Sequence, residues 1–122
     1  MNIEQIMSFP VVVTRETTKL KHTRELINRK SINAIPVLKE DGEIAGILSS
    51  SDLAKAHDKN ITVGDIMTDK VHIVLKNNRV QDAAKTMLKH SVHHLVVMED
   101  GNVIGMVSSL DIIRSLVSTE GI

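Results

Sequence analysis

Gly46-Ile47-Leu48-Ser49-Ser50-Ser51-Asp52-Leu53 and Gly105-Met106-Val107-Ser108-Ser109-Leu110-Asp111-Ile112 are two versions of one string, and this string decides the fold. In each version a glycine and apolar strand-forming residues run directly into polar residues that favour the start of a helix. The first N–H groups of a helix have no internal partner and the helix dipole is positive there, so the junction suits a phosphate. The serine hydroxyls add donors, and the aspartate can accept hydrogen bonds from the hydroxyls of a sugar.

The same spacing has a purely structural interpretation. Ser49-x-x-Asp52 and Ser108-x-x-Asp111 fit the capping box, in which the serine and the acid satisfy only the amides of their own helix. For one copy alone the capping interpretation is favoured. The presence of two copies shifts the balance toward a ligand site.

The repetition extends over the whole chain. Ile6-Met7-Ser8 and Ile66-Met67-Thr68 are 60 positions apart, whereas Gly46 and Gly105 are 59 apart. A fixed period of this kind predicts two copies of one unit, at residues 1–57 and 58–122. Because a unit of about 60 residues is marginally stable alone, we expect the copies to pack about a pseudo-twofold axis, share a core and form paired clefts.

Each copy is predicted to have the element order β-α-β-β-α, which makes the fold class α+β. In the first copy the pattern predicts a short strand, a helix, two strands and a second helix, at residues 10–14, 18–30, 34–38, 43–48 and 52–57. The inner face of the first of these helices should carry Leu20, Thr23 and Ile27. Asp41-Gly42 supplies the positive φ of a tight hairpin. His57-Asp58-Lys59-Asn60 is the predicted link to the second copy.

The second copy shows the same pattern more clearly. Its long helix should bury the apolar stripe Val80, Ala83, Ala84, Met87 and Leu88. Asn78 with Gln81 is predicted to cap that helix. Strands at 94–98 and 103–107 should pair across Asp100-Gly101. A closing helix at 111–117 should turn its apolar residues inward, namely Ile112, Ile113, Leu116 and Val117.

Composition excludes several classes of function. The 122 residues carry 15 basic and 15 acidic side chains, so no strong field favours nucleic acid or an anionic membrane. Phe9 is the only aromatic residue, which leaves no platform for stacking bases. No apolar run approaches the ~20 residues needed for a membrane span, and the N-terminus lacks signal-peptide character. The absence of cysteine suits a cytoplasmic protein.

Catalysis and metal binding are the weaker interpretations. No nucleophile lies beside a base and no glycine-rich phosphate loop is present, so we do not expect an enzyme. His90, His93 and His94 have spacings that occur in zinc sites. However, the repeat alignment begins a new strand after His90, which would scatter the three rings.

The ordered set of features resembles a cystathionine-β-synthase (CBS) domain, and the tandem resembles a CBS pair, or Bateman module. The resemblance rests on the element order, the Ile-Met opening, the strand Asn33-Ala34-Ile35-Pro36-Val37, the Asp-Gly hairpin and the Gly-apolar-apolar-Ser-x-x-Asp close. It covers residues 3–118. It implies a regulatory module that binds AMP, ADP, ATP or S-adenosylmethionine in clefts between the repeats, forms a disc-like homodimer and acts on an unknown protein partner.

The resemblance also implies which residues contact the nucleotide. The closing string would hold phosphate and ribose through Ser49, Ser50, Asp52, Ser108, Ser109 and Asp111. A carboxylate on two vicinal hydroxyls makes charge-assisted hydrogen bonds, roughly twice as strong as neutral ones. The adenine would lie against Val12, Val13, Ile35 and Pro36, or against Ile73, Val74, Leu95 and Val96. The alternative for these apolar positions is a plain core role.

The two clefts are not expected to be equal. His93 and His94 stand where some CBS domains place groups that reach phosphates, whereas the first copy has Asn33 and Ala34. Because imidazole titrates near pH ~6.5, its attraction for phosphate should strengthen in mild acid. Solvent-facing strand histidines are the alternative. The second copy also has Val96 in place of the usual proline and Leu110 in place of Ser51.

A pure interaction module, a dimer that holds a partner and binds no small molecule, remains the competing hypothesis. It predicts no thermal shift with any adenosine compound. A ligand that binds the folded form must stabilise it, by roughly 2.7 kcal/mol at a hundredfold excess over Kd.

Overall fold

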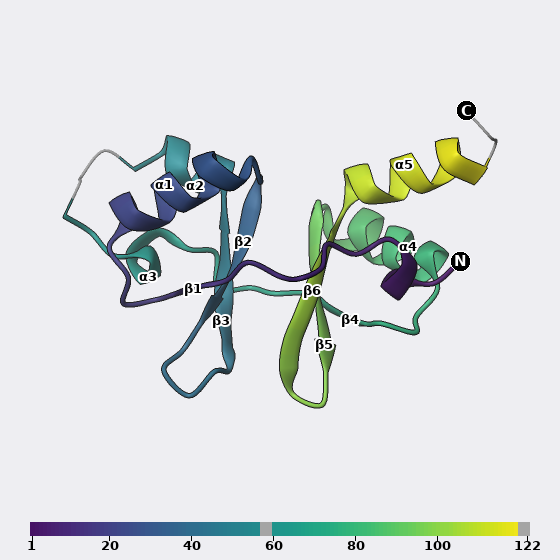
Figure 1. Cartoon of the computed structure of the whole chain (residues 1–122), viewed down its shortest axis with the longest axis horizontal. Coiled ribbons are helices and arrows are strands. Elements are labelled where there is room, and N and C mark those ends of the chain that lie inside the picture. Colours follow the sequence, from purple (N-terminus) through teal and green to yellow (C-terminus); the bar gives the residue numbers. More distant parts are fainter. Residues whose placement is uncertain (57–59, 120–122) are drawn as a thin grey trace. The chain divides into compact units, whose positions relative to one another are not determined.

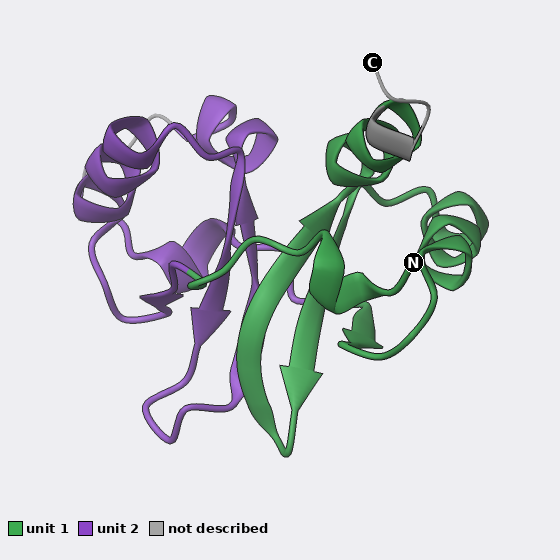
Figure 2. Ribbon diagram, turned by 45° about the vertical axis from the view of Figure 1, so that its right-hand side comes forward, with its two compact units in different colours: residues 1–11, 72–122 green, residues 12–71 purple. Residues whose placement is uncertain are grey.

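Two three-stranded sheets, each with its own helices, make up the chain (Figure 1). The computed structural model describes residues 1–56 and 60–119, so residues 57–59 of the predicted link lie outside it. The chain forms two compact units, unit 1 with residues 1–11 and 72–122 and unit 2 with residues 12–71 (Figure 2). These compact units differ from the sequence repeats because the opening segment of each repeat lies in the other repeat's unit.

Unit 2 has a mixed sheet, with strand order β1-β2-β3. Strand β1 runs parallel to β2, and β2 is antiparallel to β3. Its elements are β1 (Thr14–Arg15), α1 (Leu20–Lys30), β2 (Ala34–Leu38), β3 (Ile44–Ser49), α2 (Ser50–Ala54) and α3 (Val63–Ile66). The first strand is shorter than predicted, and α2 ends earlier, at Ala54.

Unit 1 repeats this plan with strand order β4-β5-β6. Strand β4 is parallel to β5, and β5 is antiparallel to β6. Its elements are the 3₁₀ helix η1 (Ile3–Gln5), β4 (Ile73–Leu75), α4 (Val80–His90), β5 (His94–Glu99), β6 (Asn102–Ser108) and α5 (Ser109–Thr119). The α+β class and the doubling of the unit are therefore confirmed. No helix in the described ranges 1–56 and 60–119 is long and apolar enough to cross a membrane.

The two hairpins turn where the sequence predicts. Gly42 and Gly101 have φ values of +88° and +80°, and Asp100 also lies in the left-handed region at +51°. Such backbone is accessible to glycine without a Cβ clash, and aspartate tolerates it. The Asp-Gly pairs therefore set the register of the hairpins that carry the closing strings.

The exchanged segments form the starts of the long helices. The N–H of Leu20 donates to the carbonyl of Ile61 at 2.9 Å, and the N–H of Val80 donates to that of Met1 at 3.2 Å. These backbone bonds replace side-chain caps, which both helices lack. The prediction that Asn78 caps α4 is therefore wrong. Asn78 Oδ1 instead accepts from the N–H of Leu75 at 2.8 Å and shapes the turn before the helix.

Gly46 and Gly105 permit a second contact of the exchanged segments. Ile47 and Thr68 bond reciprocally through their backbones at 2.9 Å, and Ser8 donates to the carbonyl of Met106 at 2.8 Å. A Cβ on Gly46 would lie 2.6 Å from the Thr68 carbonyl oxygen, and one on Gly105 would lie 2.9 Å from that of Ser8. Each glycine thus lets a neighbouring backbone lie directly on the strand.

Each unit has its own core cluster. Unit 1 buries Ile3, Val74, Ala83, Met87, Leu95, Val97 and Val107, and unit 2 buries Leu20, Ile27, Ile35, Val37, Leu48, Leu53 and Val63. Ile3 and Val63 come from the exchanged segments, and both are fully buried. The repeats therefore depend on each other through exchange of segments.

The predicted inner face of the closing helix is wrong in part. Ile112 packs on the core of unit 1, but Ile113, Leu116 and Val117 are 55%, 62% and 43% exposed. Leu88, predicted in the buried stripe of α4, is 82% exposed. The apolar face of each of these helices is wider than the surface of the three-stranded sheet that can cover it, so part of the face stays exposed.

Candidate functional site

The two closing strings form helix caps of the same design. In unit 2 the N–H of Ser49 donates to Asp52 Oδ2 at 2.9 Å, and Ser49 Oγ donates to the same oxygen at 3.0 Å. In unit 1 the N–H of Ser108 donates to Asp111 Oδ2 at 2.8 Å, and the N–H of Asp111 donates back to Ser108 Oγ at 3.1 Å. The capping interpretation is therefore confirmed for both pairs.

The caps leave one oxygen of each carboxylate with weaker partners. Asp52 Oδ1 receives a long hydrogen bond from Thr68 Oγ1, at 3.4 Å. Asp111 Oδ1 lies 3.6 Å from the Arg114 guanidinium, a contact of a largely exposed arginine. Each oxygen of a carboxylate can accept two hydrogen bonds, so both aspartates retain acceptor capacity for a pair of vicinal hydroxyls.

Thr68 lies beside the candidate site, and the sequence reasoning missed it. It lies on the exchanged segment, which pairs with β3 through Ile47 and so brings a hydroxyl beside Asp52. The available signal was the repeated opening Ile-Met-Ser/Thr, because Thr68 stands 60 positions after Ser8.

The second serines of the closing strings behave differently from the first. Ser50 Oγ donates to the carbonyl of Asn33 at 3.1 Å, away from the Ser49–Asp52 cap. The N–H groups of Ser50 and Ser109 donate at 2.9 Å to the carbonyls of Asn33 and His93. These amides are thus committed to the protein, and the structure does not bring the Ser50 hydroxyl together with Asp52.

The two copies of the site differ in the length of the helix that follows the closing string. Helix α2 has five residues and α5 has eleven. Because the macrodipole sums over aligned peptides, α5 stabilises an anion at its start better than α2 does. The positive end of the helix therefore favours an anion at Ser108 and Asp111 more than at Ser49 and Asp52.

His94 lies beside the second closing string. It pairs with Ser108 across β5 and β6, and it is partly buried, whereas its neighbour His93 is exposed. Burial lowers the pKa of His94, the charge of His93 lowers it further, and Asp111 opposes both. His94 is therefore neutral at pH 7 and gains its charge only in more acidic solution than an ordinary histidine.

The apolar candidate positions fall into three groups. Ile35, Val74 and Leu95 belong to the core clusters. Pro36 and Val96 are fully buried but belong to neither cluster. The remaining positions retain exposed surface: Val12 and Val13 are partly exposed, and Ile73 is 48% exposed.

The strand register also shows that Val12 and Val13 of the first copy do not correspond to Ile73 and Val74, respectively, of the second. Thr14 pairs with Val37 and Val74 pairs with Val97, so Val74 is the counterpart of Thr14, and His72 is the counterpart of Val12. A uniform offset of 60 positions would have given this alignment.

The three histidines of the metal hypothesis do not form one cluster. His90 ends α4 and stacks on His72, with ring centroids 4.2 Å apart. Within residues 1–56 and 60–119, no group of three or more His, Cys, Asp or Glu side chains has a metal-binding arrangement.

Comparison with known proteins assigns the family. The family model described as "CBS domain" matches residues 3–59 and again residues 63–118. A Methanocaldococcus jannaschii protein, MJ1426, is 29% identical over 96% of this chain and 92% of its own length. The homoserine O-acetyltransferase of Methanocorpusculum labreanum is 32% identical, but the matched part is 89% of this chain and only 23% of the enzyme.

Solved structures agree with this assignment. The crystal structure of the CBS domain pair of protein MJ0100, in complex with 5′-methylthioadenosine and S-adenosyl-L-methionine, has a TM-score of 0.89 and 28% identity, over 98% of both chains. The CBS domain NE2398 has a TM-score of 0.86 at 24% identity, over 96% of this chain and 98% of that one. The chain therefore belongs to the CBS-domain family and consists of two CBS domains in tandem.

Proposed function

We propose that this chain is a regulatory module that binds adenosine-containing ligands, with AMP, ADP, ATP and S-adenosylmethionine as the candidates. The observation that carries the proposal is the duplicated Ser–Asp pair, in which each carboxylate retains acceptor capacity after capping its helix. The CBS pair of MJ0100, 28% identical, was crystallised with two adenosine compounds, which supports the ligand class. No catalytic step is assigned to this chain.

In this proposal the aspartates hold the ribose. Asp52 with Thr68, or Asp111 with Arg114 beside it, accepts hydrogen bonds from the 2′ and 3′ hydroxyls. Ser49 and Ser108 face the sugar or phosphate, whereas the N–H groups of Ser50 and Ser109 already donate to the carbonyls of Asn33 and His93 and are assigned no ligand contact. The eleven-residue α5 favours the second repeat for an anionic ligand, and the adjacent His94 adds a positive charge only in acidic solution. The adenine contacts Val12 and Val13, or Ile73, together with strand backbone.

The role of the aspartates is tested by replacing each with asparagine. Asp52→Asn and Asp111→Asn keep an oxygen that can cap the helix but remove the charge that strengthens a ribose hydrogen bond. Calorimetric titration with AMP and S-adenosylmethionine should show at least one of them weakening binding by about tenfold or more, since hydrogen bonds to charged groups contribute ~1.5–3 kcal/mol.

Asp65 provides a matched control. It caps α3 by the same geometry, with the N–H of Thr62 donating to Asp65 Oδ2 at 2.9 Å, but it lies outside the closing strings. Asp65→Asn should leave ligand affinity unchanged. If all three variants bind the ligand with the same affinity, or if the control loses as much affinity as the other two, the closing strings serve only to cap their helices.

We also propose that the module is a homodimer. Neighbouring helices α4 and α5 expose a set of large apolar side chains, namely Leu88, Leu110, Ile113, Leu116 and Val117. Large exposed apolar side chains on neighbouring helices favour an interaction site. A dimer through this face that binds no small molecule is the second candidate function, and it predicts no thermal stabilisation by any adenosine compound. In either case the signal passes to a protein partner through a change in association.

A further inference from the structure

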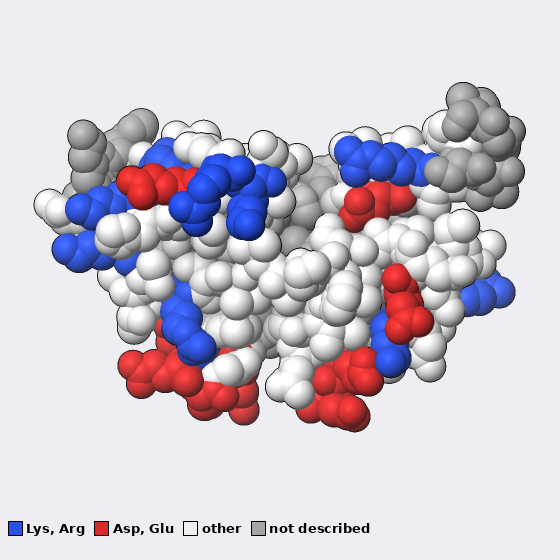
Figure 3. Space-filling view, in the orientation of Figure 1, with Lys and Arg blue, Asp and Glu red and all other residues white. Residues whose placement is uncertain are grey.

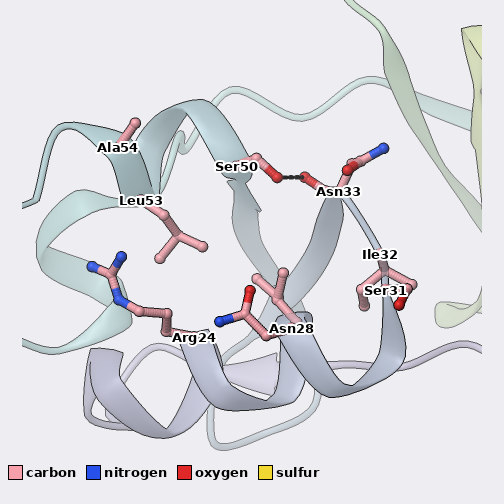
Figure 4. Close-up of a pocket in the computed structure, with 9 residues that line it drawn as sticks. Arg24, Asn28, Ser31, Ile32, Asn33, Ser50, Leu53 and Ala54 are labelled. Atoms are coloured by element: carbon pink, nitrogen blue, oxygen red, sulfur yellow. Dashed lines mark hydrogen bonds between the residues drawn. The ribbon is translucent and has the colours of Figure 1, made fainter.

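A pocket of about 520 Å³ lies in unit 2, between α1, the loop that follows it and α2 (Figure 4). Its volume is in the range of small-molecule sites. The buried side chains of Ile27 and Leu53 form an apolar floor, extended by Ile32 and Ala54. The rim is polar and is made by Arg24, Asn28, Ser31, Asn33 and Ser50.

Arg24 gives the pocket a positive charge that no acid neutralises. Its side chain is partly buried and extends from α1 toward Leu53 on α2 (Figure 4). None of the nine lining residues is acidic, and no salt bridge of Arg24 occurs in the described part of the chain. A partly buried guanidinium without a counter-ion is a strong site for a carboxylate or phosphate.

The surroundings strengthen this preference for an anion. Helix α1 carries four basic side chains, Lys21, Arg24, Arg29 and Lys30, against the single acid Glu25. Figure 3 shows blue side chains gathered on the part of the surface where α1 lies. Like charges around a pocket with a low-dielectric wall raise the local concentration of an anion.

Among the residues that the structure describes, Asn28 on the rim has an unbonded amide, and Ser50 on the rim is bonded to Asn33. The Asn28 amide points from α1 toward Leu53, and its side chain has no hydrogen bond in residues 1–56 and 60–119 (Figure 4). The hydrogen bond of 3.1 Å from Ser50 Oγ to the Asn33 carbonyl ties α2 to the start of β2 at the other end.

From these features we propose that the pocket binds a small organic anion. Its carboxylate or phosphate head pairs with Arg24 and Asn28, and its apolar body lies on Ile27, Ile32 and Leu53. The site is separate from the Ser49–Asp52 pair, because Asp52 bonds to Thr68 on the exchanged segment while Ser50 and Leu53 of the same helix line the pocket.

The second repeat lacks the chemistry of this site and serves as an internal comparison. The repeat alignment places Ala84 at the position of Arg24 and Leu88 at that of Asn28. Both replacements remove the groups proposed to hold the anionic head. The anion site is therefore specific to the first repeat and is not a general feature of the duplicated fold.

The proposal is tested by NMR titration of the ¹⁵N-labelled chain with octanoate. Inorganic phosphate tests an anionic head group without an apolar tail, and octylammonium tests the same apolar tail with a positively charged head group. Octanoate should shift the amides of residues 24–33 and 50–54 in a saturable way, more strongly than phosphate, and octylammonium should not. Arg24→Ala, which installs the residue of the second repeat, should weaken octanoate binding by at least about tenfold. Arg24→Lys should weaken octanoate binding less than Arg24→Ala does.

Arg29→Ala is the matched control, since it removes a cation from the same helix at a position outside the pocket. It should retain octanoate binding, and so should Asp52→Asn. Shifts confined to α4 and α5, equal binding of octylammonium, or equal losses in Arg24→Ala and Arg29→Ala would each overturn the proposal. Because the readout contains no adenosine compound, it is independent of the proposed nucleotide site.

Discussion

At the scale of single residues, the structure shows that one side chain can serve two purposes. Asp52 and Asp111 cap their helices with one oxygen and leave the other to weak partners. The two interpretations of Ser-x-x-Asp are therefore compatible. Thr23 shows how a buried polar side chain is accommodated. The helical period predicts that it lies inside, and there its hydroxyl forms a hydrogen bond with that of Thr14 at 2.8 Å. The period determines the direction of a side chain but not its partner.

His94 should make the stability of the fold depend on pH. Its pKa is lowered in the folded state, chiefly by burial, so the unfolded chain takes up the proton first as the pH falls. Its contribution is complete above the unfolded pKa of ~6.5 and decreases as the pH falls toward the folded value. Urea denaturation from about pH 7.5 to 5 should show a smaller loss of stability for His94→Gln than for the parent chain.

The exposed His22 on α1 supplies the control for this measurement. His22→Gln should follow the parent curve. A parent curve that stays flat through this range, or a His94→Gln variant that loses stability as steeply as the parent, would contradict the burial argument.

At the scale of elements, the exchanged segments explain features that local rules do not. The starts of α1 and α4 lack side-chain caps because the carbonyls of Ile61 and Met1 accept from their first N–H groups. Gly46 and Gly105 are needed for a similar reason: they face the backbone of residues 68 and 8 at close range. A glycine in the interior of a strand is unfavourable by itself, so its presence in both copies indicates a neighbouring backbone.

Gly46→Ala should therefore destabilise the fold. The new Cβ would lie 2.6 Å from the Thr68 carbonyl oxygen and 2.9 Å from Met67 Sδ, so the segment must move away from β3. Overpacking of this kind costs ~1–3 kcal/mol, measurable by chemical denaturation. The displaced segment would also carry the Thr68 hydroxyl away from Asp52.

Gly101→Asn makes a useful comparison, because no atom lies within 4 Å of its Cβ position and asparagine tolerates the φ of +80°. It should change stability by less than Gly46→Ala. The close-approach argument fails if Gly46→Ala unfolds at the same urea concentration as the parent chain.

At the scale of the whole molecule, the two repeats are folded by exchange of their opening segments. Unit 1 contains residues 1–11, and Ile3 is fully buried in its core although it lies almost at the N-terminus. Val63 has the same place in unit 2. Because each core includes residues of the other repeat, a single repeat would lack part of its core.

Ile3→Ala should cost ~2–5 kcal/mol of unfolding free energy, the range for a buried isoleucine. The control is Ile113→Ala, since Ile113 is 55% exposed and its truncation should change stability by less than ~0.5 kcal/mol. Similar denaturation midpoints for the two variants would show that the N-terminal segment does not contribute to the core of unit 1.

The exposed apolar face of α4 and α5 is the proposed dimer interface. Leu116 is 62% exposed, so Leu116→Lys should leave the fold intact and weaken the proposed dimer by about tenfold or more. Sedimentation velocity over a range of concentrations measures the effect. Leu75→Lys alters a leucine on β4 that is 51% exposed, outside the proposed interface, and should remain dimeric. A parent chain that sediments as a monomer at all concentrations would reject the dimer.

The sequence alone was sufficient for the duplication, the β-α-β-β-α order within each copy, the Asp-Gly hairpins and the pairing of each closing serine with its aspartate, but not for the short helices η1 and α3 of the opening segments. These features depend on period and on contacts between residues close in the chain, so they are visible in a single string of letters. Tertiary structure alone decided the exchange of segments, the place of Thr68 beside Asp52, the pocket under Arg24 and the outward face of α5. Burial and long-range backbone pairing determine these features, and both depend on which distant segment lies opposite.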